Sequence, residues 1–189
     1  MRVMADVYLP ADSQRRLMLS ARRTLEAITR GCEYKELTES DPHLELIKYG
    51  AFVTLYNQHV LRGCVGTCTP SSALSTIVVE MTEAAATRDP RVKPVRVEEL
   101  EHIQIYVSVI SPLDAADDPL SLEIGKHGLY IARNRKRGVF LPEVAVEHGW
   151  NPAEFLAQTC IKANLPRNAW QWAGTKIALF TALQIEEER

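Results

Sequence analysis

Two runs of strand-forming residues, 51–56 and 60–65, are separated by only three polar residues. The first run reads Ala-Phe-Val-Thr-Leu-Tyr, which is rich in aromatic and β-branched side chains, and the second begins and ends with valine. Parallel neighbours need a crossover connection of a dozen or more residues, so a linker this short joins antiparallel strands in a hairpin. The chain therefore contains an antiparallel sheet.

Helical patterns alternate with the strand patterns along the chain. A first helix begins after an N-cap at Asp12 or Ser13 and ends at Gly31. A second helix begins near Pro70 and stops at Asp89. In both segments apolar residues recur every three or four positions, so each helix presents one apolar stripe to a core.

The second half of the chain continues the alternation. Strand patterns fall at 103–109, 122–124, 129–132, 139–141 and 176–185, and the second and third of these form a hairpin. Pro142 opens a short helix, Asn151 caps the next one, and Asn164 ends that helix in the left-handed conformation. We therefore expect an α+β fold, a largely antiparallel sheet flanked by helices, in a single domain over residues 1–189.

Composition excludes several partners. The 22 Lys and Arg against 24 Asp and Glu give a formal net charge of −2, without the basic excess that non-specific nucleic-acid binding requires. The first ten residues lack the apolar core of a signal peptide, and no run approaches the roughly 20 apolar residues that span a bilayer. Cysteines are few and unevenly spread, as expected of free thiols in a reducing compartment. We expect a cytoplasmic protein that binds neither nucleic acid nor membrane.

The segment Leu61–Thr67, Leu-Arg-Gly-Cys-Val-Gly-Thr, departs from ordinary strand composition because it contains two glycines. If strand alternation persists, Arg62 and Cys64 share a face, and the guanidinium lies beside the thiol and favours the thiolate. A helix beginning near Pro70 would add its partial positive charge just past Cys68. Such a site also suits an anion such as phosphate or carboxylate.

A structural interpretation of the same segment is equally simple. Cys64 and Cys68 can be small apolar side chains filling a tight junction, with the glycines serving only packing. A zinc site formed by these two cysteines with His59 or His127 is a weaker hypothesis, because a lone Cys-x3-Cys pair lacks the second pair of standard sites. We therefore expect no metal and no cofactor, and the chain contains no nucleotide-binding or hydrolase motif.

The chain resembles the AMMECR domain family, whose microbial members are called AmmeMemoRadiSam system protein A. The resemblance is carried by 50–55, the segment Leu61–Thr67, Asp89-Pro90-Arg91, the Gly-x-His-Gly-Leu run at 125–129, and 138–145. It implies an α+β fold of two unequal lobes and a cytosolic protein that acts with a Memo-like protein and a radical SAM enzyme. It supplies no activity.

Two functional hypotheses follow. In the first, the protein is a binding or adaptor component that holds an anionic small molecule or protein substrate through Arg62, Gly63, Gly66, Thr67, Arg91 and His127. In the second, it is a cysteine-dependent enzyme or transferase in which Cys64 is the nucleophile and His127 the base. The sequence does not decide whether the protein is an enzyme.

Overall fold

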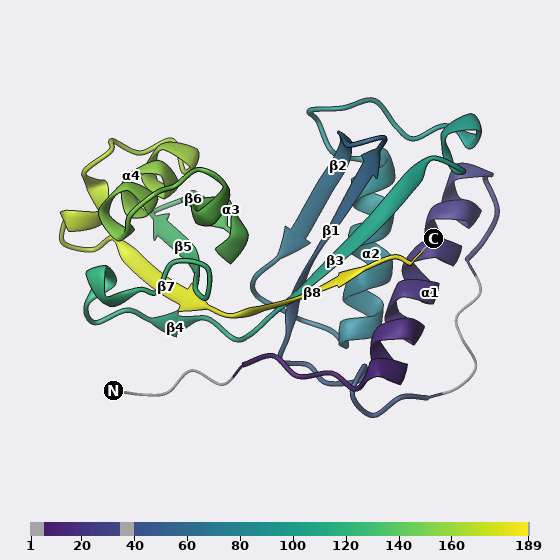
Figure 1. The fold of residues 1–189 in the computed structure, drawn as a ribbon, viewed down its shortest axis with the longest axis horizontal. Coiled ribbons are helices and arrows are strands. Elements are labelled where there is room, and N and C mark those ends of the chain that lie inside the picture. Colours follow the sequence, from purple (N-terminus) through teal and green to yellow (C-terminus); the bar gives the residue numbers. More distant parts are fainter. Residues whose placement is uncertain (1–5, 35–39, 189) are drawn as a thin grey trace. The chain divides into compact units, whose positions relative to one another are not determined.

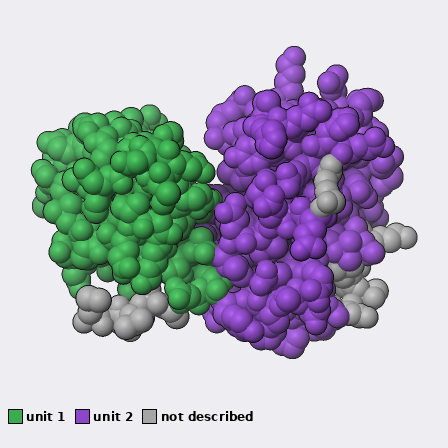
Figure 2. Space-filling view, viewed as in Figure 1, with its two compact units in different colours: residues 1–7, 111–182 green, residues 8–110, 183–189 purple. Residues whose placement is uncertain are grey.

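A computed structural model describes residues 6–34 and 40–188. The chain divides into two compact units, shown in separate colours in Figure 2: unit 1 comprises residues 1–7 and 111–182, and unit 2 comprises 8–110 and 183–189. Each unit combines segments that are distant in the sequence, so no single cut of the chain separates them. The two units are unequal, as the resemblance implies.

Unit 2 is a four-stranded sheet with two long helices (Figure 1). The strand order is β2-β1-β3-β8, and the elements are α1 (Ala11–Thr29), β1 (Gly50–Asn57), β2 (Val60–Thr67), α2 (Leu74–Thr87), a 3-10 turn η1 (Val97–Glu99), β3 (Ile103–Ile110) and β8 (Ala182–Glu186). β1 pairs antiparallel with both β2 and β3, which confirms the first hairpin.

Both helices of unit 2 lie on one face of its sheet (Figure 1). Strand alternation explains this arrangement, because Val53 and Leu55 on β1 and Ile105 on β3 are fully buried, while their neighbours Thr54 and Tyr106 are only half-buried. We call the opposite side, which carries Thr54 and Tyr106, the helix-free face. Strand β2 forms one edge of the sheet.

Unit 1 is a second four-stranded sheet, with strand order β4-β7-β5-β6 and antiparallel pairing. Its elements are β4 (Asp114–Ala115), a 3-10 turn η2 (Pro119–Ser121), β5 (Gly128–Arg133), β6 (Lys136–Phe140), α3 (Pro142–Glu147), α4 (Pro152–Lys162), a 3-10 turn η3 (Ala169–Gln171) and β7 (Lys176–Phe180). Helix α4 packs on β5 and β6 over a core that contains Leu129, Ile131, Phe155, Leu156 and Cys160.

Several expectations from the sequence are confirmed. The Asn151 side chain accepts the backbone N–H of Glu154 at 2.9 Å, so it caps α4 as expected. Asn164 has φ +56° and Gly31 has φ +69°, the left-handed conformation expected after a helix. The α+β class and the antiparallel sheets are also as expected.

Four expectations are wrong. Helix α1 begins at Ala11 with Pro10 at its N-cap, so neither Asp12 nor Ser13 caps it. Helix α2 begins at Leu74 rather than near Pro70. The segment 122–124 is not a strand, and β5 instead pairs with β6 around a turn in which Asn134 has φ +56°. The strand expected over 176–185 is interrupted at Thr181, because β7 belongs to the sheet of unit 1 and β8 to the sheet of unit 2. The alternation of apolar and polar side chains continues through such a change of sheet, so the sequence pattern does not reveal it.

Among residues 6–34 and 40–188, no helix combines the length and the apolar character needed to cross a membrane.

Candidate functional site

The segment Leu61–Thr67 forms most of β2, and it is not a regular strand. Gly63 lies opposite Leu55, but Leu61 lies opposite Tyr56, so Arg62 is an extra residue with no partner on β1. This β-bulge interrupts the alternation of side chains. The expected placement of Arg62 and Cys64 on one face through an unbroken pleat therefore fails.

The guanidinium of Arg62 hydrogen-bonds to the segment that follows α2. Its Nε and Nη2 donate to both carboxylate oxygens of Glu99, at 2.6 and 2.9 Å. The remaining donors reach the carbonyl oxygens of Lys93 and Pro94. The side chains of Arg62 and Glu99 are only 15% and 13% exposed. The hydrogen bonds from Arg62 lower the pKa of Glu99 to about 2, against the effect of burial. All three nitrogens of Arg62 are bonded, so this side chain chiefly links β2 to the segment after α2.

Asp89 and Arg91 bind the outer edge of β2 at Cys64. The buried Asp89 carboxylate accepts the backbone N–H of Cys64 at 2.9 Å, and Arg91 Nη2 donates to the Cys64 carbonyl oxygen at 2.9 Å. Arg91 also donates through Nε and Nη2 to both oxygens of Asp89. These hydrogen bonds, with that from Arg91 first, hold the pKa of Asp89 well below its usual range although burial opposes them. The two side chains thus occupy the place of a neighbouring strand.

Both glycines of the segment are required by packing. A Cβ on Gly63 would lie 2.0 Å from the carbonyl oxygen of Ala85 in α2, so this glycine lets the helix approach the strand. A Cβ on Gly66 would lie 2.1 Å from Cδ1 of Phe52. Cross-strand pairing places Gly66 opposite Phe52, so the ring lies over the glycine on the helix-free face. The packing interpretation therefore accounts for Gly63 and Gly66.

The thiol of Cys64 remains without a structural explanation. Cys64 pairs with Thr54 across the strands, which places its half-buried side chain on the helix-free face. The Thr54 hydroxyl donates to Sγ at 3.2 Å. Arg91 is the neighbouring guanidinium: its pKa is raised chiefly by the hydrogen bond with Asp89, with further contributions from the Asp89 charge and the Cys64 sulfur. Cys64 therefore lies between a hydroxyl donor and a cation.

The end of the segment has a structural role. The Thr67 hydroxyl accepts the backbone N–H of Thr69 at 3.2 Å, which fixes the turn after β2. Burial raises the pKa of the Cys68 thiol to about 12, so this side chain is a neutral packing group. The effect expected from a helix start at Cys68 does not arise, because α2 begins six residues later, at Leu74.

His127 lies in unit 1, in the loop before β5. Its Nδ1 accepts the backbone N–H of Glu123 at 3.0 Å, and burial is the main cause of a pKa below the usual value for histidine. The imidazole thus stabilises its own loop as a neutral acceptor. Arg62, Gly63, Cys64, Gly66, Thr67 and Arg91 all lie in unit 2.

Three residues of the site were not among the candidates found from the sequence, and one of them, Asp89, is expected there only as the end of the second helix. Thr54 gives no signal, because threonine is an ordinary strand residue. Glu99 follows β2 by 32 positions in an acidic stretch, and nothing local marks it as the partner of Arg62. Across the described part of the chain, no three His, Cys, Asp or Glu side chains gather closely enough to hold a metal ion. The zinc arrangement is therefore not formed there.

Comparison with known proteins agrees with this architecture. The AMMECR1 family profile matches residues 18–185. A protein of Methanothermobacter thermautotrophicus is 37% identical over 186 residues, which is 95% of this chain and 97% of the other. A protein of Thermococcus kodakarensis is 38% identical over 182 residues, 91% of this chain and 89% of its own.

A solved structure shows the same fold. The crystal structure of an uncharacterised protein from Pyrococcus horikoshii matches with a TM-score of 0.84 and 35% identity, over 93% of this chain and 91% of the other. The fold and the glycine and cysteine strand thus define an α+β protein with two four-stranded antiparallel sheets. The chain belongs to the AMMECR1 family.

Proposed function

We propose that this protein is a binding or adaptor component that holds an anionic group of a small molecule or protein substrate beside Cys64. The observation that carries the proposal is the state of Arg91. Its side chain is 56% exposed, and its Nη1 makes no hydrogen bond to the described residues. Asp89 fixes the guanidinium through the other edge, so two donors are held ready for an acceptor.

This proposal assigns different roles to the two arginines. Arg62 has all three nitrogens bonded and is largely buried, so it stabilises the fold. In Arg91, which is 56% exposed, Nη1 makes no hydrogen bond to the described residues, and Nη2 contacts the carbonyl oxygen of Cys64, whose side chain is half-buried. Asp89 balances the charge of Arg91, so the site suits a single carboxylate or phosphate oxygen pair bound weakly rather than a polyanion.

A titration observed by NMR tests the proposal. Phosphate and acetate are added separately to the native chain, and the Nε–H signals of the arginine side chains are followed. We expect the Arg91 signal to shift in a saturable manner, the Arg62 signal to stay in place, and Arg91→Lys to weaken binding because lysine lacks the planar fork. Equal shifts at Arg62 and Arg91, or a linear drift without saturation, would contradict the proposal.

The partners implied by the family resemblance belong to the same proposal. A Memo-like protein and a radical SAM enzyme are each mixed with the native chain, and complex formation is measured by calorimetry. Thr54→Arg places a bulky side chain on the helix-free face beside Cys64, whereas Val60→Arg changes a 64% exposed side chain near the hairpin turn. We expect binding to fall at least about tenfold in Thr54→Arg and not in Val60→Arg. A larger loss of binding in Val60→Arg than in Thr54→Arg would exclude the helix-free face as the partner-binding surface.

A second function, a cysteine-dependent enzyme, is favoured by one observation. The Thr54 hydroxyl donates to Cys64 Sγ at 3.2 Å, so the sulfur of the half-buried side chain is held in place on the helix-free face. The test is the alkylation rate of Cys64 against pH, compared with a free cysteine derivative. An enzyme predicts a faster rate at neutral pH that Thr54→Val lowers. A rate no faster than that of the free thiol excludes this function.

A further inference from the structure

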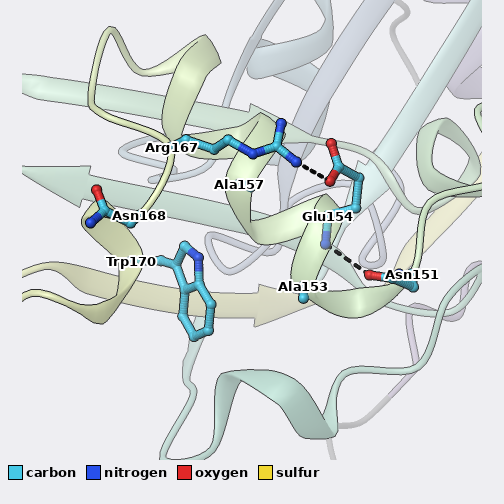
Figure 3. A pocket seen from close by; sticks show the side chains of 7 residues that line it. All are labelled: Asn151, Ala153, Glu154, Ala157, Arg167, Asn168 and Trp170. Atoms are coloured by element: carbon cyan, nitrogen blue, oxygen red, sulfur yellow. Dashed lines mark hydrogen bonds and ion pairs between the residues drawn. The ribbon is translucent and has the colours of Figure 1, made fainter.

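Unit 1 contains a cavity that the proposed function does not use. Its volume is about 400 Å³, and Figure 3 shows the side chains that surround it. The cavity lies between the first turns of α4 and the segment before β7, and its lining comprises Asn151, Ala153, Glu154, Ala157, Arg167, Asn168 and Trp170. A volume of this size is within the range of small-ligand pockets.

One wall of the cavity is a large aromatic ring. Trp170 belongs to η3 and is half-buried, because one part of it packs against the core of unit 1 while the rest borders the cavity (Figure 3). Its indole N–H donates to no acceptor in the described part of the chain. The floor is apolar, since Ala157 is 6% exposed. A flat apolar surface of this kind suits a stacked ring.

The opposite wall is an ion pair whose arginine has unused hydrogen-bond donors. Arg167 Nη2 donates to Glu154 Oε2 (Figure 3). Glu154 Oε1 also accepts from Gln158 Nε2 at 2.8 Å. The other nitrogens of Arg167 make no hydrogen bond within the described ranges, and its side chain is 57% exposed. Glu154 cancels the charge of Arg167, so the wall offers hydrogen-bond donors without a net positive charge.

The Asn168 carboxamide completes the lining. It is exposed, and it caps no backbone group of the η3 turn. An amide offers one acceptor and two donors in a plane, which matches the edge of a heteroaromatic base. The polar groups around the cavity are therefore donors from Arg167, Asn168 and Asn151, acceptors from the Asn168 amide and the part-exposed Glu154 carboxylate, and an aromatic face on Trp170.

We infer that this cavity binds a neutral, planar heteroaromatic ring of nucleoside size, stacked on Trp170 and hydrogen-bonded at its edge by Asn168 and Arg167. The excess of donors selects a ring with several acceptors. The neutral ion pair gives no preference for an attached phosphate. Because the cavity is shallow and largely open to solvent, the dissociation constant is expected to be roughly 0.1–2 mM.

The test uses adenosine, guanosine, cytidine and uridine with the full chain. The three tryptophan indole N–H signals are followed by NMR, and each is assigned by substitution. At least one nucleoside should shift the Trp170 signal in a saturable manner and leave the Trp172 signal unchanged. Trp172, which is 40% exposed, lies outside the cavity lining and serves as the control. Saturable binding that shifts only Trp172 or Trp150 would overturn the inference.

Two variants and one ligand pair sharpen the result. Trp170 contributes to the core, so Trp170→Ala also removes core packing. Asn168→Ala is therefore made as a separate variant, because it changes an exposed side chain and leaves the core untouched. Each should weaken binding at least about fivefold, and Trp172→Ala should not. A nucleoside and its 5′-monophosphate should bind equally. Binding of the monophosphate alone, or no shift of Trp170 with any nucleoside up to about 10 mM, would overturn the inference.

Discussion

Asp89 accepts the backbone N–H of Cys64 with a carboxylate that is itself only 2% exposed. Arg91 completes the contact by donating to the Cys64 carbonyl oxygen, so one ion pair satisfies both backbone groups that an edge strand leaves open. The same pair leaves Nη1 of Arg91 without a hydrogen bond to the described residues. Arg91 therefore has a structural role at the edge of β2 and also the proposed binding role.

Removing the charge of Asp89 should destabilise unit 2. Asp89→Asn keeps the size of the side chain but replaces a charged acceptor that serves Cys64 and Arg91, and we expect a loss of about 2–4 kcal/mol in the free energy of unfolding. Urea denaturation measures it. Asp12→Asn is the control, since its ion pair with Arg15 is exposed and should contribute less than about 0.5 kcal/mol. Equal effects of the two substitutions would contradict the role of Asp89.

Stability should fall at acid pH because of the lowered pKa values of Asp89 and Glu99. The pKa of Glu99 is lowered from 4.5 to about 2, so its contribution is complete above pH 4.5 and is lost as the pH falls toward 2. This shift corresponds to about 3 kcal/mol. Urea midpoints between pH 6 and pH 2 should therefore decrease, and Glu99→Gln should flatten part of that decrease. A Glu99→Gln profile parallel to that of the native chain would show that the ion pair with Arg62 does not form.

The two kinds of glycine in unit 2 should respond differently to substitution. Gly63→Ala places a Cβ 2.0 Å from a backbone oxygen of α2, which cannot move independently, so we expect a loss of about 3 kcal/mol. Gly31→Ala meets no atom within 4 Å and should cost about 1 kcal/mol through its left-handed backbone alone. Thermal unfolding of both variants measures the difference. A loss of stability for Gly63→Ala no larger than that for Gly31→Ala would mean that α2 does not pack closely against Gly63.

Cys68 should be unreactive over the ordinary pH range. Burial raises its pKa to about 12, so the thiolate fraction stays small up to about pH 10. Alkylation followed peptide by peptide should modify the exposed Cys32 first and leave Cys68 largely intact. If Cys68 reacted as fast as Cys32 at pH 8, the thiol would be in contact with water and the packing role would be wrong.

Local signals predicted much of the fold. The three-residue connection after residue 56 predicted the first hairpin, and Asn151 predicted the start of α4. Helix α2 begins at Leu74, later than the sequence indicates, because Pro70 resembles a first-turn proline but precedes a loop. The break at Thr181 leaves no local signal, since a strand that leaves one sheet for another keeps its alternation.

The sequence singles out the segment Leu61–Thr67 as the candidate site and gives Arg62 and Arg91 the same role, whereas their contacts differ. Their difference depends on residues far away in the sequence, because Glu99 occupies Arg62 while Asp89 leaves one edge of Arg91 free. The bulge at Arg62 is likewise a property of the pairing with β1, and no residue type announces it.

The most direct test of the account is the alkylation of Cys64 in the native chain with and without phosphate. Cys64 is half-buried, so it should react more slowly than the exposed Cys32 and faster than the buried Cys160. Phosphate bound at Arg91 should lower the alkylation rate of Cys64 several-fold and leave the alkylation rate of Cys32 unchanged. A Cys64 thiol that reacts only after unfolding, or one whose rate does not respond to phosphate, would contradict a binding site on the helix-free face.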